Sequence, residues 1–373
     1  MNRTEYRRYL PQSVVNRGNR QPIRLCMRKA MAGRPLTLGF LGGSITQGSL
    51  ASSPEKRYVS LVCDWWKHAF PQSRVTCLNA GIGGTTSQFG VARVQEDLLS
   101  SQPDLVVVEF SVNDDPTDFY EETYEGLVRA LQESTLSPAL LLLHNVRYDN
   151  GVSAEEQHSA IGKAYHLPCV SMKPCLYRAV LDGAVEAADI SPDGLHPNDF
   201  GHRLVADTVI HCLEEIRLDV WNNESPDPLP PPVTQNRYQH SRRMQSRSCM
   251  PESTGFEADR RKREGVWDCF QGGWSAAGPG ASIVFQARGT GFAVQYRKTV
   301  KHPALTACAV LDGDEAHAVR LDGNFNETWG DCLAIANIAS GLPDKSHRLE
   351  IRTMEPGQEH AAGFYLASVI VSE

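Results

Sequence analysis

Five short apolar runs recur along the first two-thirds of the chain, each followed by polar or glycine-rich residues. They are residues 36–41, 75–78, 105–110, 139–143 and 167–170. A continuous apolar run of roughly four to eight residues is typical of a strand that is covered on both faces. These runs therefore predict the strands of a buried, mainly parallel sheet.

Helical periodicity occupies the segments between these runs. Apolar residues spaced three and four apart recur in residues 23–31, 55–70, 119–131, 154–165 and 200–218. Alternation of strands and helices is typical of a layered domain with helices on both faces of the sheet. The pattern predicts a three-layer α/β/α, flavodoxin-like domain. In open sheets of this kind the sites lie at the carboxyl ends of the strands.

The character of the chain changes at the proline-rich residues 222–232, which predict a stiff, extended linker. Beyond it, strand-like runs alternate with turn signals at residues 282–287, 291–296, 305–311, 316–321, 348–352 and 363–371. They predict an all-β sandwich of the jelly-roll type. The predicted organisation is an N-terminal arm and helix (1–34), an α/β domain (35–220), a linker (221–234) and a β-sandwich (235–373).

Charge and composition exclude several classes of partner. The 373 residues are 41% hydrophobic and carry a formal net charge of −7, so nothing draws the whole chain to nucleic acid or to an anionic membrane. No apolar stretch reaches the roughly 18 residues of a membrane span. The first 30 residues differ, with eight Arg or Lys against one Glu. We interpret them as a solvated or docking arm, and they are the one hint of a homodimer.

The ten cysteines are scattered, with no C-x-x-C pair and no spacing suited to zinc. The N-terminus has no apolar core of a signal peptide. We therefore expect reduced, mostly buried thiols and a cytoplasmic location. No metal or other cofactor is expected.

The first candidate for chemistry is Gly42-Gly43-Ser44-Ile45-Thr46, directly after the first apolar run. Two glycines permit a sharp turn, after which Ser44 either projects its hydroxyl into a site or caps the next helix. This is not the G-x-S-x-G turn of α/β-hydrolases, because Thr46 stands in place of the last glycine.

Two further blocks offer hydrogen-bond donors. The segment 79–86 (NAGIGGTT) follows the second run, and its glycines expose backbone N–H groups of the kind that hold an oxyanion. Asn113, after the third run, carries a side-chain amide that can do the same. The alternatives are a tight turn or a phosphate loop for the first block and an Asx turn for the second.

The fourth block is Asp193-Gly194-Leu195-His196-Pro197-Asn198, just before the last predicted helix of the domain. Two titratable side chains three residues apart can meet across one tight turn. The carboxylate would then orient the imidazole, whose other nitrogen is left to take a serine proton. The alternative is a loop that only caps the helix.

Taken together, GGSIT, NAGIGGTTS, SVND and DGLHPN resemble the four sequence blocks of the SGNH (GDSL-like) hydrolase superfamily, over roughly residues 35–217. The resemblance implies Ser44 as nucleophile, Asp193 and His196 as its acid–base partners, and an oxyanion hole made by Ser44, Gly84 and Asn113. Many members have Asp where this chain has Gly43. That Asp is not a member of the triad, so the difference leaves the implied activity intact.

The superfamily includes carbohydrate acetylesterases, lipases, thioesterases and arylesterases. A β-sandwich that resembles a carbohydrate-binding module favours the first class, and we expect acetylated mannan or xylan oligosaccharides as substrates. The alternatives are an esterase, lipase or thioesterase acting on a non-carbohydrate ester, an acyltransferase, and a non-catalytic carbohydrate-binding protein.

Candidate substrate-binding residues follow from their positions and chemistry. His144 ends the fourth apolar run and so faces the expected site. Phe325 and Trp329 belong to a segment that is both polar and aromatic, and aromatic faces pack on sugar rings. Trp267 and Trp274 are further stacking candidates, with the sandwich core as the alternative. His202 is expected to be structural or solvated, and His211 and Cys212 have no partners for a metal.

Overall fold

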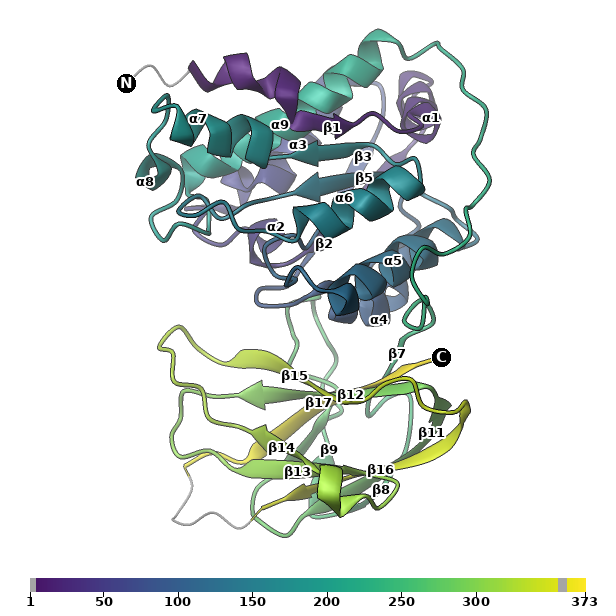
Figure 1. Cartoon of the computed structure of the whole chain (residues 1–373), viewed down its shortest axis with the longest axis vertical. Coiled ribbons are helices and arrows are strands. Elements are labelled where there is room, and N and C mark those ends of the chain that lie inside the picture. The colour runs from purple at the N-terminus through teal and green to yellow at the C-terminus, as the bar shows by residue number, and fades with distance from the viewer. Residues whose placement is uncertain (1–4, 355–360) are drawn as a thin grey trace. The chain divides into compact units, whose positions relative to one another are not determined.

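The computed structural model describes residues 5–354 and 361–373. The chain divides into two compact units, Met1–Asn236 and Arg237–Glu373, drawn from purple to teal and from green to yellow in Figure 1. Within the described residues, no helix is both long and apolar enough to cross a membrane.

A six-stranded sheet forms the centre of the first unit, in the order β1-β6-β5-β4-β2-β3. Its strands are β1 (Val14–Asn16), β2 (Leu36–Gly42), β3 (Val75–Gly81), β4 (Leu105–Glu109), β5 (Ala139–His144) and β6 (Cys169–Ser171). All neighbours pair in parallel except β1, which pairs antiparallel to β6. Counted from β2, the five parallel strands have the 2-1-3-4-5 order of flavodoxin-like folds. The predicted fold class of this unit is confirmed.

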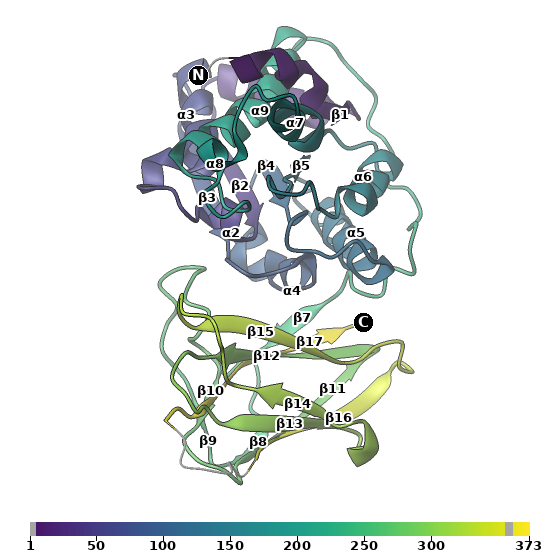
Figure 2. The ribbon, with the colours of Figure 1, turned by 60° about the vertical axis from the view of Figure 1, so that its left-hand side comes forward.

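Helices cover both faces of this sheet (Figure 2). The α-helices are α1 (Gln21–Met31), α2 (Ser44–Gln47), α3 (Tyr58–Ala69), α4 (Ser87–Asp97), α5 (Asp118–Gln132), α6 (Glu155–Ala164), α7 (Arg178–Leu181), α8 (Ala187–Ile190) and α9 (Asp199–Leu218). The shorter turns are η1 (Glu5–Ser13), η2 (Pro54–Lys56), η3 (Leu99–Ser101) and η4 (Lys173–Tyr177). Helices α1 and α3 contact α9, whereas α4 and α6 contact α5. Alternate strand residues such as Leu36, Leu38 and Phe40 join the core that includes α1, α3 and α9.

The N-terminal segment corrects the expectation of a solvated arm. Tyr6 and Tyr9 of η1 are buried, and their hydroxyls donate to Asp207 and Asp182. Strand β1 extends the sheet at β6. From residue 5 onward the arm is therefore part of the first unit, because long-range hydrogen bonds and aromatic burial hold it there. The basic arm no longer gives a reason to expect a homodimer.

The proline-rich segment, predicted as a stiff, extended linker, is hydrogen-bonded to the first unit near its end. The backbone N–H groups of Val233 and Thr234 donate to Glu125 of α5, at 2.7 and 2.8 Å. The carbonyl of Pro230 accepts a hydrogen bond from Arg129 at 2.8 Å. Extended backbone leaves its polar groups unpaired within the segment, so they bond to the unit beside it. The unit boundary accordingly falls at residue 236.

The second unit contains antiparallel sheets of short strands. One has the order β15-β12-β17-β10-β9, with β7 also paired to β17, and the other has the order β14-β13-β16-β11-β8. The strands are β7 (Arg242–Met244), β8 (Glu252–Thr254), β9 (Phe256–Ala258), β10 (Trp274–Ala276), β11 (Ser282–Gly289), β12 (Gly291–Lys298), β13 (Thr306–Leu311), β14 (Val319–Asp322), β15 (Cys332–Ala339), β16 (Lys345–Thr353) and β17 (Phe364–Ser372), with the turn η5 (Glu315–His317).

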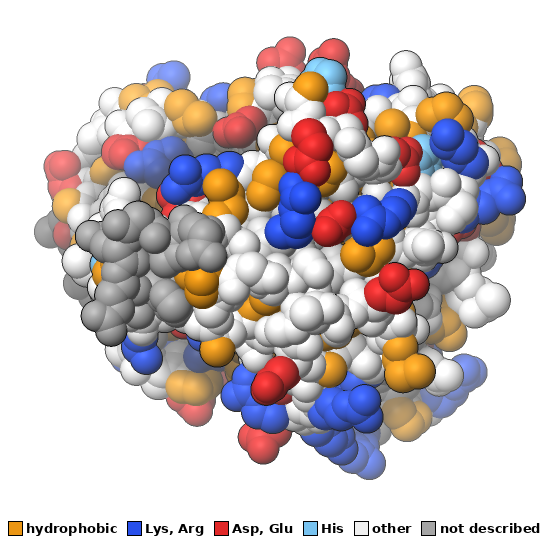
Figure 3. Space-filling model, turned by 90° about the horizontal axis from the view of Figure 1, so that it is seen from below, with side chains coloured by type: hydrophobic (Ala, Val, Ile, Leu, Met, Phe, Trp, Pro, Cys, Tyr) orange, Lys and Arg blue, Asp and Glu red, His pale blue; other side chains and the backbone are white. Residues whose placement is uncertain are grey.

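Alternating burial holds these sheets together. Phe285 of β11 and Leu349 of β16 come from one sheet, Phe292 of β12 and Leu366 of β17 from the other, and all belong to one hydrophobic core. This arrangement is that of a β-sandwich, as predicted. The jelly-roll connection remains a prediction. Figure 3 shows one face of the molecule, on which basic and acidic side chains are interspersed.

One pair of cysteines corrects the expectation of ten reduced thiols. Cys63 of α3 and Cys77 of β3 form a disulfide, with their Cα atoms 6.4 Å apart. Helix α3 packs on β3 and so brings together two residues that are 14 positions apart in the sequence. The other eight cysteines are free.

Candidate active site

The three residues of the first and fourth motifs lie in one chain of hydrogen bonds. Ser44 follows β2 as the first residue of α2, and His196 lies in the loop before α9. Ser44 Oγ is 2.9 Å from His196 Nε2, and His196 Nδ1 is 2.7 Å from Asp193 Oδ2. Since a carboxylate only accepts, Nδ1 carries the hydrogen and Nε2 is left to accept from the serine hydroxyl.

The loop itself fixes the carboxylate of Asp193. Its Oδ1 accepts hydrogen bonds from the backbone of Leu195 (3.0 Å), the backbone of His196 (2.7 Å) and the hydroxyl of Ser191 (3.0 Å). Burial alone would raise the pKa of Asp193, but the hydrogen bonds from the ring and backbone of His196 outweigh it and hold this pKa well below its usual range. Asp193 is therefore ionised at neutral pH and orients the imidazole through its Nδ1.

Two backbone N–H groups near Ser44 are available to a ligand. Gly84 has φ of +68° and is exposed, and among the described residues nothing accepts its N–H or that of Ser44. The neighbouring Gly83 differs, because its N–H donates to Gln47 Oε1 at 2.6 Å. Gln47, which the sequence analysis did not single out, therefore fixes the glycine loop against the helix that begins with Ser44.

Asn113 lies directly against the backbone beside Ser44. An ideal Cβ on Gly43 would lie 2.1 Å from Asn113 Oδ1 and 3.2 Å from its Nδ2. The turn after β4 carries this side chain, since the N–H of Asn113 bonds to the carbonyl of Phe110 at 2.9 Å. Strands β2 and β4 are neighbours at the point where the strand order reverses, which is where open α/β sheets bind ligands.

Buried polar groups lie beneath the turn that carries Ser44. Thr46 Oγ1 is 2.8 Å from the hydroxyl of Tyr58 and 3.3 Å from Glu109 Oε2. Burial raises the pKa of Glu109 to about 7, although hydrogen bonds from Asn145 and Thr46 oppose the rise. Thr46 thus links α2, the helix that begins with Ser44, to the end of β4.

His144 does not fulfil the expectation that it lines the substrate pocket. Its side chain is fully buried at the end of β5, with its ring centre 6.1 Å from that of His158. Burial, followed by the neighbouring His158, lowers its pKa to about 3. Helices cover this strand end, so the side chain faces the interior rather than a ligand. His202 is buried too, as its structural interpretation requires.

The aromatic candidates of the second unit separate into two groups. Trp274 is 3% exposed and packs edge-to-face on Phe285 in the core, so it is not a stacking residue. Trp329 is 64% exposed and Trp267 46% exposed. Phe325 is half-buried, and its ring centre is 4.8 Å from that of Trp329.

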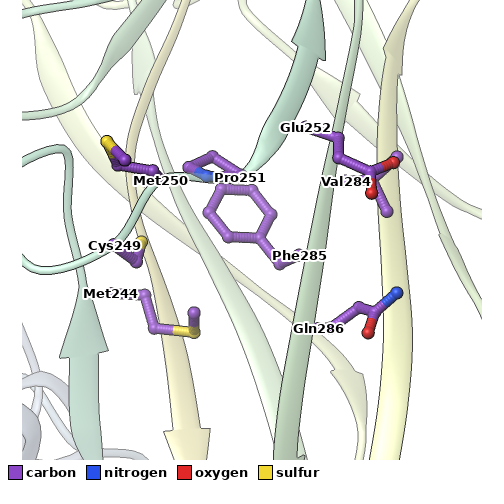
Figure 4. A pocket seen from close by; sticks show the side chains of 8 residues that line it. All are labelled: Met244, Cys249, Met250, Pro251, Glu252, Val284, Phe285 and Gln286. Carbon is purple, nitrogen blue, oxygen red and sulfur yellow. The ribbon is translucent and has the colours of Figure 1, made fainter.

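A pocket of about 230 Å³ in the second unit lacks the groups for ester hydrolysis (Figure 4). It is lined by Met244, Cys249, Met250, Pro251, Glu252, Val284, Phe285 and Gln286. Burial raises the pKa of its one thiol, Cys249, and thereby disfavours the reactive thiolate.

The comparisons with known proteins agree with this geometry. The model of the GDSL-like lipase/acylhydrolase family matches residues 40–204. Thioesterase 1/protease 1/lysophospholipase L1 of Escherichia coli strain K12 is 30% identical over 187 residues, which are 48% of this chain and 84% of that protein. This chain belongs to the GDSL-like lipase/acylhydrolase family. It is an ester-hydrolysing serine hydrolase.

A solved structure resembles this GDSL-like hydrolase over both units. It is a two-domain esterase (CEX) active on acetylated mannans, 47% identical, covering 98% of each chain with a TM-score of 0.94. A second crystal structure of such an esterase, co-crystallised with mannopentaose, matches with the same values.

Proposed function

We propose that this hydrolase removes O-acetyl groups from acetylated oligosaccharides, with mannan-derived oligosaccharides as the leading substrates and xylan-derived ones next. The hydrogen-bonded chain Ser44–His196–Asp193 supports the proposal most directly. The similarity to an esterase active on acetylated mannans supports the choice of substrate.

The proposed mechanism is acyl transfer through a covalent intermediate. His196 Nε2 takes the proton of Ser44 while Oγ attacks the acetyl carbonyl. The N–H groups of Ser44 and Gly84 and the amide of Asn113 hold the oxyanion, each contributing about 10²–10³ in kcat. His196 then gives its proton to the sugar alcohol as it leaves. Water repeats these steps, which releases acetate and restores Ser44.

Phe325 and Trp329 enter the proposal as the sugar-stacking residues of the second unit. The base of their loop is anchored, because the N–H of Phe325 donates to Thr299 O at 3.0 Å and the ring of His302 donates to Phe325 O at 2.7 Å. An anchored aromatic pair with an exposed indole offers a preformed face to the C–H groups of a sugar ring.

The deciding experiment measures acetate release from acetylated mannan and xylan oligosaccharides by the full chain and by Ser44→Ala. Release by the wild type alone supports the proposal. Turnover of p-nitrophenyl acetate without release from any glycan contradicts the carbohydrate substrate but keeps the esterase. Palmitoyl-CoA and a lysophospholipid belong in the same panel, because the Escherichia coli relative is named for both activities. Release that persists in Ser44→Ala contradicts the mechanism.

The noncatalytic alternative is disfavoured by the same hydrogen bonds. A protein that only binds sugar has no use for a serine whose hydroxyl donates to an oriented imidazole. Labelling of Ser44 by a fluorophosphonate separates the two functions, since only an activated serine is phosphonylated.

Location and assembly stay predictions. A disulfide such as Cys63–Cys77 persists in oxidising compartments and is rare in the cytoplasm. Rapid alkylation of freshly lysed cells tests the cytoplasmic location: ten modified cysteines agree with it, and eight contradict it. Light scattering of the full chain tests the homodimer.

A further inference from the structure

The carboxylate of Asp114 joins the two loops that carry the proposed oxyanion donors. Asp114 follows Asn113, and the N–H groups of both residues donate to Phe110 O at 2.9 Å. Its Oδ1 accepts the backbone N–H of Ser87 at 2.9 Å. Ser87 is the first residue of α4 and lies three positions after Gly84. One buried side chain therefore spans from the Asn113 turn to the Gly84 loop.

Asp114 also caps the N-terminus of α4, where the N-cap side chain itself makes no capping bond. Thr86 stands at the N-cap of this 11-residue helix but makes no side-chain capping bond. A carboxylate at a helix N-terminus both satisfies a free N–H and interacts favourably with the helix dipole. The start of α4, and with it the end of the Gly84 loop, is thus held by a residue of the turn after β4.

His158 of α6 holds the other oxygen of the same carboxylate. Its Nε2 donates to Asp114 Oδ2 at 3.1 Å, and neither side chain is exposed. The imidazole stacks on Tyr124 with ring centres 3.6 Å apart and planes within 5°. The stacking fixes the plane of the ring, so His158 presents Nε2 to Asp114 in one direction only.

A second bond ties α6 to the Asn113 turn. The N–H of Ala154, the residue before α6, donates to Ser111 O at 2.7 Å. The backbone bond fixes where the helix begins, and the His158–Asp114 bond fixes how the carboxylate is turned. Within the described residues, neither Asp114 nor His158 is hydrogen-bonded to Ser44, His196 or Asp193.

We propose that Asp114 and His158 are positioning residues of the oxyanion hole, which set the separation of Asn113 and Gly84. The inference rests on the proposed function, since it concerns the donors of that mechanism. Oxyanion stabilisation depends on donors fixed before charge develops. A displacement of about 1 Å costs up to about 10²-fold in rate. Substrate binding in the ground state depends much less on these donors.

The test compares His158→Phe, His158→Gln and Asp114→Asn with the wild type in the full chain. Phenylalanine keeps a ring against Tyr124 but donates nothing to Asp114, whereas glutamine retains a donor. For p-nitrophenyl acetate we expect His158→Phe to lower kcat about 10- to 100-fold with KM within about 2-fold. His158→Gln should recover most of kcat. Asp114→Asn should resemble His158→Phe.

Tyr165→Phe is the matched structural control. The hydroxyl of Tyr165, just beyond the other end of α6, donates to Glu125 of α5 at 2.5 Å. Its removal also breaks a buried hydrogen bond of the α5–α6 pair and should lower Tm, yet kcat should be unchanged. If His158→Phe lowers Tm in the same way and leaves kcat within about 2-fold, the pair is only structural and the proposal is overturned.

The rate of phosphonylation of Ser44, followed by the mass of the intact protein, separates this proposal from the proposed function. This reaction also places negative charge in the oxyanion hole and needs no knowledge of the substrate. Slow phosphonylation of His158→Phe and restored rates in His158→Gln support the positioning role even when no glycan is deacetylated. Equal rates in all variants contradict it, whatever the natural substrate is.

Discussion

The side chain of Asn113 occupies the space that a Cβ on residue 43 would need. An ideal Cβ on residue 43 would lie 2.1 Å from Asn113 Oδ1. Gly43 is therefore the residue that permits the amide of Asn113 to approach the backbone at Ser44. The atom in the way is the far end of a flexible side chain, so a larger residue at position 43 would displace it at little cost in stability.

Gly43→Asp should consequently impair this chain. We expect kcat for p-nitrophenyl acetate to fall roughly 10-fold or more, up to the ~10²–10³ of losing one donor, with Tm nearly unchanged. The double variant with Asn113→Ala checks the cause. It should be no slower than Asn113→Ala alone, because the two changes act on one donor. Additive losses would contradict this explanation.

The five parallel strands of the first unit were predictable because each rests on a local apolar run, such as 105–110. Three of the motifs follow such runs directly, and the fourth precedes a helix with a clear period. Parallel strands bring their carboxyl ends to one edge, so Ser44 and Asn113 were expected near each other. Helix α4 was not predicted, because its buried face includes Gly90 and Arg93 and so lacks a clear apolar stripe.

The remaining features depend on contacts between distant residues. The burial of Tyr6 depends on Asp207, 201 positions away, and the residues around η1 carry no pattern that predicts this contact. The environment of His144 depends on the helices that cover β5. The bond of His158 to Asp114 spans 44 positions and joins a helix to a strand-end turn. Such contacts carry no periodic signal in one sequence, so the burial of His144 could not be predicted from it.

Asp193→Asn should abolish most activity while leaving the fold intact. The amide can still accept from the backbone of Leu195 and His196, but it no longer stabilises an imidazolium or enforces the tautomer of His196. We expect kcat to fall about 10²- to 10⁴-fold with little change in KM. Ser191→Ala, which removes one bond to Asp193, should cost far less. If Asp193→Asn keeps more than about a tenth of the wild-type kcat, Asp193 is not the acid–base partner that orients His196.

Trp329→Ala should weaken the use of oligosaccharides without affecting a small ester. Loss of one stacking face corresponds to about 0.5–1.5 kcal/mol, or roughly a 3- to 10-fold rise in KM for acetylated mannooligosaccharides. Hydrolysis of p-nitrophenyl acetate should be unchanged. Trp221→Ala is the matched control, because Trp221 is 68% exposed, close to the 64% of Trp329, and lies in the first unit. An equal effect of both variants would contradict a specific stacking role.

The buried His202 should cost the first unit stability as the pH falls from about 6.5 to 4, whereas Glu109, whose pKa is raised to about 7, contributes in the opposite direction. Burial lowers the pKa of His202 to about 4, and its Nδ1 accepts the N–H of Tyr58 at 3.3 Å, which requires a neutral ring. Between about pH 6.5 and 4, the His202 imidazole is protonated in the unfolded chain and neutral in the folded chain. The free energy of unfolding should thus fall by about 1.4 kcal/mol per pH unit for each such histidine.

Urea titrations between pH 7.5 and 4.5, followed by the circular dichroism of the helices, measure this slope for the first unit, which holds the long helices. His144, whose pKa is lowered to about 3, should contribute in the same direction. His202→Asn retains an acceptor for Tyr58 but does not titrate, so its slope should be smaller by about 1.4 kcal/mol per pH unit. An unchanged slope in this variant would show that His202 is not the group responsible.

Reduction of the Cys63–Cys77 disulfide should destabilise the first unit without stopping catalysis. The bond closes a loop of 14 residues and limits the unfolded chain, which corresponds to about 3 kcal/mol. Strand β3 ends in the glycine loop that carries Gly84, so the loss should appear first as inactivation at lower temperature. Half-lives of esterase activity with and without dithiothreitol, measured over a range of temperatures, check this expectation.

The variant with both Cys63→Ala and Cys77→Ala separates the disulfide from the other thiols. It should inactivate as early as the reduced wild type and should not respond to dithiothreitol, because the remaining eight cysteines are already free. Wild type and variant should have the same kcat at 25 °C, since neither cysteine is hydrogen-bonded to the proposed catalytic groups. Thiol titration of the wild type in denaturant should give eight thiols before reduction and ten after it if the bond forms. If it does, and dithiothreitol nevertheless leaves the inactivation of the wild type unchanged, the bond contributes no stability.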